Sequence, residues 1–144
     1  MWREFFQRYS SECKFSIPAS QNGIDDIEKS LGIEFPVELR SLLQETNGVY
    51  DQYGCSLIWS IERIKTNNLK FRNHSDFKDL YMPFDHLLFF ADAGNGDQFA
   101  YAILNGVIRG SNIYVWNHED DSRTWKAPSL EKYIEWLLSG KLKV

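Results

Sequence analysis

The sequence predicts an α+β fold with a central antiparallel sheet, and with N-terminal helices and a C-terminal helix packed against it. Residues 87–91 form an apolar run and residues 98–103 again favour a strand. The Gly94-Asn95-Gly96 turn between them predicts a β-hairpin, because glycine and asparagine tolerate the positive φ of a tight reversal. Helices are predicted mainly before and after this sheet rather than alternating with its strands. That segregation disfavours a parallel nucleotide-binding sheet.

Three helices are predicted before the sheet. Aromatic side chains at helical spacing predict the first helix over residues 2–11. Ser20 or Asn22 caps the second helix, and Gly32 ends it, because glycine readily adopts the left-handed conformation of a helix end. A third helix is predicted over residues 35–47, since proline is tolerated in a first helical turn.

The sequence after residue 54 predicts the strands of the sheet and the helices that flank it. A strand at residues 55–59 and a helix over residues 61–70 precede a polar loop at residues 74–83. The remaining strands are predicted at residues 87–91, 98–103, 107–109, 112–116 and 123–126, with further turns at Asn105-Gly106 and Gly110. Ser129 caps a C-terminal helix that extends to Leu138. Without a repeat or a linker, residues 1–144 are predicted to form one domain.

The composition narrows the function classes. The chain has 144 residues and a formal net charge of -4, which disfavours nonspecific nucleic-acid binding. Cys13 and Cys55 form neither a zinc-binding pattern nor a disulfide framework. The sequence has no apolar stretch of membrane-spanning length and no signal-peptide pattern at its start. These features predict a cytoplasmic protein with reduced thiols and no membrane partner.

The hairpin turn contains oxygen-bearing side chains that could serve as cation ligands. These are Asp92, Asn95 and Asp97, but glycines stand at two positions where an EF-hand loop needs ligands. We interpret the three side chains as turn residues, because Asp and Asn satisfy backbone donors in tight turns.

The densest polar cluster is the segment His118-Glu119-Asp120-Asp121. Imidazole and carboxylates can bind a metal, yet adjacent loop residues rarely supply the fixed geometry of a ligand set. We favour the interpretation that this segment is a solvated loop. If it has a function, it provides an anionic patch that binds a basic partner. No nucleophile–base, zinc-protease or phosphate-binding motif is present. We therefore predict no enzymatic activity, no cofactor and no metal.

Four segments together resemble one family. They are Phe35-Pro36 through Asn47-Gly48, the hairpin over residues 89–100, the strand and turn over residues 113–119, and the helix over residues 129–138. In this order and spacing they are similar to the SUKH superfamily, which includes the Smi/Knr-type cell-wall regulators of fungi and many bacterial immunity proteins. The resemblance spans about residues 20–140. The chain departs from it at Ala102-Ile103 and at Asn117, where similar proteins often carry aspartate.

The resemblance implies a function without catalytic chemistry. Bacterial members are similar to immunity proteins that bind and neutralise a cognate polymorphic or contact-dependent toxin, frequently a nuclease. The alternative is a regulatory or scaffolding interaction domain without a toxin partner. A small-ligand-binding or enzymatic protein is the third class, which the missing catalytic motifs disfavour. The oligomeric state stays open.

The family supplies no universal site residues, so the partner-binding residues are predicted from charge and aromatic character. An inhibitor that competes with a polyanion needs an acidic contact surface with aromatic anchors. The candidates are Asp51 and Tyr53 in the loop after the third helix, and Glu119, Asp120 and Asp121 after the strand that contains Trp116.

Overall fold

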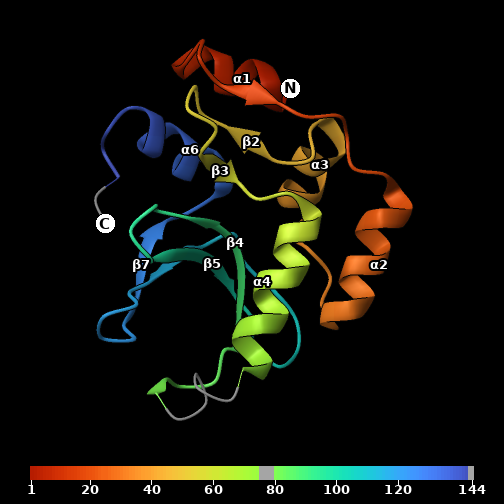
Figure 1. Cartoon of the computed structure of the whole chain (residues 1–144), viewed down its shortest axis with the longest axis vertical. Helices are drawn as coiled ribbons and strands as arrows, with labels where there is room; N and C mark the ends of the chain where they lie inside the picture. The colour runs from red at the N-terminus through yellow and green to blue at the C-terminus, as the bar shows by residue number, and fades with distance from the viewer. Residues whose placement is uncertain (75–79, 143–144) are drawn as a thin grey trace.

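The predicted α+β class is confirmed by the computed structural model, which describes residues 1–74 and 80–142 (Figure 1). The elements are α1 (Trp2–Tyr9), β1 (Lys14–Phe15), α2 (Gln21–Leu31), α3 (Val37–Glu45), β2 (Val49–Tyr50), β3 (Ser56–Ile58), α4 (Ile61–Asn73), β4 (Leu87–Asp92), β5 (Gln98–Ala102), β6 (Ile113–Trp116), β7 (Arg123–Ala127) and α6 (Leu130–Leu138).

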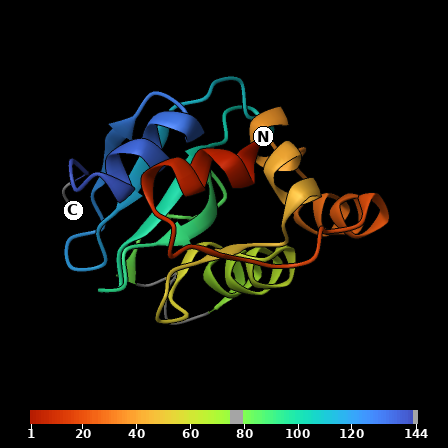
Figure 2. The ribbon, with the colours of Figure 1, turned by 90° about the horizontal axis from the view of Figure 1, so that it is seen from above.

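The strands form two antiparallel sheets. The smaller sheet has the order β1-β2-β3, and the larger has the order β4-β5-β6-β7. The Trp59 amide, just after β3, donates to the Phe90 carbonyl oxygen at 2.9 Å and so joins the small sheet to β4. Figure 2 shows α4 on one side of the large sheet, with α6 and α1 on the other. The large sheet is therefore covered on both faces.

The apolar run at residues 87–91 does not alternate with polar residues because both faces of β4 are buried. Consecutive phenylalanines point to opposite faces of the sheet, and the register against β5 shifts between Phe89 and Ala91. Phe89 packs against Phe71 of α4, whereas Phe90 packs against Tyr133 of α6. A strand covered on both faces reads as a continuous apolar segment.

The helix termini follow the predicted capping. Ser20 accepts a hydrogen bond from Gly23 N at 3.0 Å, and Ser129 accepts one from Lys132 N at 3.2 Å. Gly32 ends α2 with φ 67°, a conformation that costs glycine little. α3 spans Val37–Glu45, which is shorter than the predicted range of residues 35–47, and Pro36 is its N-cap residue rather than part of its first turn. Local sequence therefore positions these helix ends.

The first hairpin turn also behaves as predicted. Ala93 N donates to the Asp97 carbonyl oxygen at 3.0 Å and closes the turn. The Asp92 carboxylate accepts from Gly94 N, and the Asn95 side chain accepts from Asp97 N. The side chains of Asp92 and Asn95 thus satisfy backbone donors within the turn.

The strand predicted at residues 107–109 is wrong. Only an isolated bridge joins Leu104 and Val107 around the predicted Asn105-Gly106 turn, and residues 108–112 are irregular. β5 pairs with β6 in a register that brings Tyr101 opposite Ile113. Residues 108–112 therefore lie outside the β5–β6 ladder.

Other element boundaries also differ from the predictions. α1 ends at Tyr9, α4 continues beyond residue 70 to Asn73, and the two-residue strands β1 and β2 were not predicted. β1 and β2 pair across a long sequence separation, so neither shows a local pattern. The predicted loop at residues 74–83 lies partly outside the described residues.

Candidate functional site

Trp116 is the centre of an aromatic cluster beneath the loop at residues 117–122. Only 3% of its surface is exposed. Its ring lies 5.2 to 6.0 Å, between centroids, from four other rings. These belong to Phe71, Tyr81, Phe84 and Phe89. Edge-to-face packing of this kind adds to the stabilisation from buried area. The loop after β6 thus starts from a rigid base.

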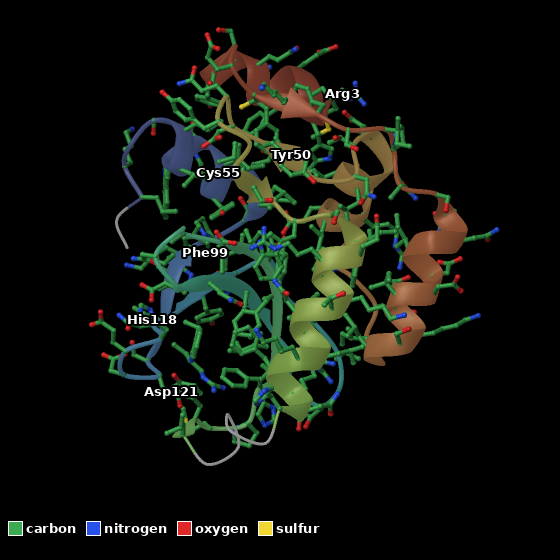
Figure 3. The ribbon with its side chains drawn as sticks, viewed as in Figure 1. Arg3, Tyr50, Cys55, Phe99, His118 and Asp121 are labelled. Atoms are coloured by element: carbon green, nitrogen blue, oxygen red, sulfur yellow. The ribbon has the colours of Figure 1, made fainter. Side chains whose placement is uncertain are left out.

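Asp121 fastens the far end of this loop to the cluster (Figure 3). Its carboxylate accepts hydrogen bonds from Trp116 Nε1 at 2.7 Å, Met82 N at 2.9 Å and Arg123 Nη2 at 3.2 Å. Partial burial raises the pKa of Asp121, but these hydrogen bonds and the Arg123 charge outweigh it, so the pKa lies below its ordinary value. The carboxylate is therefore ionised and occupied internally.

His118 fastens the near end of the loop to the first hairpin. Its backbone N–H donates to Asp97 Oδ1 at 3.1 Å, and its Nδ1 lies 2.6 Å from the same oxygen. The ring also lies against Gly96, where an added Cβ would come within 2.9 Å of Nδ1. Gly96 has φ 101°, so both space and backbone conformation require glycine. Two adjacent turns are thereby locked together.

The tip of the loop carries the free negative charge. Glu119 and Asp120 are exposed, and within residues 1–74 and 80–142 neither forms an ion pair. Asn117 accepts from Glu119 N at 2.8 Å, and Asp120 accepts from Ser122 N at 2.9 Å. The hydrogen bond from Ser122 lowers the pKa of Asp120. Two acidic side chains thus stand on a loop whose backbone is held at both ends.

The other predicted loop is also ordered by its own acidic residue. Asp51 Oδ1 accepts hydrogen bonds from Tyr53 N at 2.8 Å and from Cys55 N at 2.9 Å. The Tyr53 side chain points away from the core and is 82% exposed. Asp51 therefore shapes the turn, and Tyr53 supplies its accessible aromatic surface.

The structure does not bring the two predicted loops together. The loop between β2 and β3 lies beside α1 near the top of Figure 1, whereas the loop between β6 and β7 lies at the lower left. The labels of Cys55 and Asp121 show the same separation in Figure 3. The five predicted residues therefore belong to two separate surfaces.

Metal-ligating and thiol groups are dispersed. No group of three or more His, Cys, Asp or Glu side chains that could hold a metal ion occurs in the part of the chain that the structure describes. Cys13 is partly buried and Cys55 is exposed, and both are free thiols. Burial raises the pKa of the Cys13 thiol above its ordinary value, which makes the thiolate less available.

The structure reveals a further surface that the sequence did not indicate. Two hollows of about 780 Å³ and 520 Å³ share Pro36, Val37 and Ile108 in their walls. We call these two adjoining hollows together the α3 groove. In the sequence, the one indication of this groove is that apolar residues stand where solvent exposure is usual. Val37 is at the start of a helix, and Val107 is beside a hairpin turn.

Glu38 lies in the wall of the α3 groove and is held from inside the protein. Its carboxylate accepts from the Tyr101 hydroxyl at 3.0 Å and from Leu130 N at 3.3 Å. Burial raises the pKa of Glu38, and the nearby Glu131 charge adds to this, so the two hydrogen bonds only partly offset the increase. The folded protein thus binds the Glu38 proton more tightly than the unfolded chain does.

This raised pKa predicts a pH-dependent effect of Glu38→Gln. As pH rises from the ordinary glutamate pKa through the raised one, the unfolded chain loses the proton first, so wild-type stability falls. The glutamine variant loses no proton at this site, and its amide oxygen still accepts from Tyr101. We expect its stability relative to wild type to increase between about pH 4 and pH 7, measured by urea unfolding at several pH values. A difference that stays constant over this range would contradict the prediction.

The fold is that of an α+β domain. Residues 21–134 match the SUKH_6 family, described as SMI1-KNR4 cell-wall. The chain therefore belongs to the SUKH superfamily, which confirms the resemblance seen in its sequence. No curated protein matches the chain. Within the described residues, no helix has the length and apolar character needed to span a membrane.

Proposed function

We propose that this protein is an immunity protein that binds a cognate toxin in the cytoplasm and blocks its active or substrate-binding surface. The observation that carries the proposal is the rigidly held acidic loop on a SUKH domain. SUKH domains are associated with protein–protein interaction rather than catalysis. A bound inhibitor needs no turnover, because occupying the toxin surface is enough to stop its reaction.

The division of roles within the loop supports this proposal. Asp121 and His118 hold the backbone through contacts with Trp116 and Asp97, which leaves Glu119 and Asp120 free to meet a partner. A preorganised loop loses little conformational entropy on binding. Paired acidic side chains also accelerate association with a basic surface. A nuclease is the toxin class that fits best, because its substrate-binding surface must attract a polyanion.

The loop between β2 and β3 is proposed as a second contact. Tyr53 offers an exposed aromatic ring, and Asp51 keeps the turn in shape. Tyrosine is enriched at the energetic centres of interfaces. Since this loop lies far from Glu119 and Asp120, a toxin that meets both must cover a large part of one face.

Charge reversal at the loop tip tests the proposal. The product of the neighbouring upstream gene is taken as the candidate toxin. With it, Glu119→Lys plus Asp120→Lys is expected to slow association about tenfold at low salt and to weaken protection of co-expressing cells. The effect should shrink as salt is added, since added ions screen exposed charges. Stopped-flow binding gives the rate, and cell survival gives the protection.

A matched pair of acidic residues provides the control. Asp26→Lys plus Glu62→Lys makes the same change in net charge at exposed positions of α2 and α4, outside both proposed contact loops. The control should keep the wild-type association rate to within about a factor of two. If both double variants slow association equally, overall charge and not the loop governs binding. If the loop variant protects fully with unchanged kinetics, the loop takes no part in the mechanism.

The family description favours one alternative to the immunity function. Its reference to the cell wall is compatible with a regulatory or scaffolding domain that has no toxin partner. Wild-type protein that neither binds nor protects against the neighbouring toxin would support this alternative.

A further inference from the structure

We propose that the α3 groove receives an extended segment of the partner protein in which an aliphatic side chain lies between lysine or arginine residues. This inference rests on the proposed function, because the occupant is taken to be part of the toxin. It adds a surface distinct from the loops that carry Asp51 and Glu119.

The groove is built where several elements converge. In Figure 2 the connection between β5 and β6 arches over the top of the molecule, beside the start of α3 and the N-terminus. One hollow lies between this connection and the end of α2, and the other lies between it and the start of α1. The larger hollow, of about 780 Å³, is comparable with pockets that bury several side chains of a ligand.

Val37 lines both hollows and Val107 lines the larger one, and both side chains remain accessible to solvent. Val37 is 85% exposed and Val107 is 45% exposed, and both line the larger hollow. Leu104, which is 59% exposed, pairs with Val107 across the intervening turn. Single exposed apolar residues are ordinary, but a group of three beside a hollow is typical of an interaction site.

The backbone holds these side chains in place before any partner arrives. Leu104 and Val107 exchange two backbone hydrogen bonds, of 2.8 and 3.1 Å. Between them, Asn105 and Gly106 have φ values of 52° and 78°, as in a tight type I′ hairpin turn. On the other wall, Glu28 accepts from Phe35 N at 2.7 Å just before α3. Both walls are therefore preorganised.

The charges around the apolar centre are mainly negative. The groove-lining acids are Asp25, Glu28, Glu34, Glu38 and Glu131, and the groove-lining positive groups are Lys29, Arg109 and the amino terminus of Met1. Glu28 is paired with Arg40 and the amino terminus with Glu45, and the Glu38 carboxylate accepts from Tyr101 and Leu130 inside the protein. The remaining acids are Asp25 and Glu34 at one hollow and Glu131 at the other. Acids thus stand on both sides of the apolar centre.

This arrangement selects the chemistry of the occupant. A nucleic acid is repelled by the excess of carboxylates. A second copy of the chain, with a net charge of -4, is disfavoured for the same reason. A peptide segment with an aliphatic side chain at its centre fits Val37 and Val107, and flanking lysine or arginine residues meet the acids on either side.

A library of random twelve-residue peptides displayed on phage, panned against the full chain, tests the proposal. We expect enriched peptides to carry one or two aliphatic residues flanked by lysine or arginine. The best of them, made synthetically, should bind at least tenfold more weakly to Val37→Ser plus Val107→Ser, measured by isothermal titration calorimetry. Both valines are exposed, so this variant should keep the wild-type melting temperature.

A matched variant provides the control. Ile17→Ser removes an equally exposed apolar side chain, 80% exposed, from the segment between β1 and α2. It should bind the peptide as the wild type does. No enrichment, or equal loss of binding in both variants, would overturn the proposal, as would peptide-induced dimerisation in analytical ultracentrifugation.

A toxin experiment separates this inference from the proposed function. If wild-type protein protects against the toxin and the double-valine variant protects equally well, the groove proposal fails while the immunity function stands. If wild-type protein gives no protection but the peptide still binds in the groove, the immunity function fails while the docking surface stands.

Discussion

Replacement of Trp116 by alanine is expected to lower the free energy of unfolding by about 4 kcal/mol, the range found for large aromatic residues in protein cores. The change leaves a cavity among Phe71, Tyr81, Phe84 and Phe89. It also removes the donor that lies 2.7 Å from the Asp121 carboxylate. Urea unfolding monitored by circular dichroism gives the loss directly.

A milder substitution separates packing from hydrogen bonding. Trp116→Phe keeps most of the ring contacts but removes the indole N–H, so we expect a loss of about 2 kcal/mol. Trp125→Phe is the matched control, because Trp125 is half exposed and its indole donates to Asn112 at the surface. The control should change stability by less than about 0.5 kcal/mol. A loss below about 1 kcal/mol for Trp116→Ala would show that this indole is not part of the core.

Replacement of Asn68 by leucine is expected to cost about 3 kcal/mol, although it makes the residue more apolar. Asn68 is a buried polar residue of α4. Its side chain forms hydrogen bonds with the backbone at the edge of β4, as a neighbouring strand would. Its side-chain oxygen accepts from Phe89 N at 2.9 Å, and its Nδ2 donates to Phe89 O at 2.8 Å. Leucine leaves both backbone groups buried without a partner.

The adjacent asparagine provides the control for this prediction. Asn67→Leu makes the same chemical change one residue earlier, at a position that is only partly buried. We expect it to alter the free energy of unfolding by less than about 0.5 kcal/mol. Leucine favours the helix more than asparagine does, so helix propensity cannot account for a loss in either variant. Equal losses in the two variants would mean that the bond to β4 is not the cause.

Local patterns were sufficient to predict most of the fold. Ser20, Gly32 and Ser129 mark helix ends through chemistry that acts within a few residues. The Gly94-Asn95-Gly96 hairpin is equally local. The strands β1 and β2 of the small sheet were not predicted. They pair across more than thirty intervening residues, and neither two-residue segment has a local pattern that indicates the pairing.

The functional surfaces were harder to predict because charge in a sequence does not reveal whether a side chain is free. Asp121 has the same chemistry as its neighbour Asp120, yet its carboxylate is taken up by Trp116, Met82 and Arg123. The α3 groove depends on Val37 and Val107, which are brought together only by tertiary folding. Asn68 was a similar case, because nothing in the helix predicted over residues 61–70 indicated that its side chain contacts β4.

The anchoring of the loop at residues 117–122 has an evolutionary consequence. Trp116, His118 and Asp121 hold the loop, and Asp120 adds one hydrogen bond from Ser122 N, so Glu119 is the tip residue whose side chain contributes least to folding. Under the proposed immunity function, replacement of Glu119 would change the contact with the partner at little cost in stability. Selection on binding and selection on folding would then act largely on different residues, which would allow the partner-binding surface to diversify.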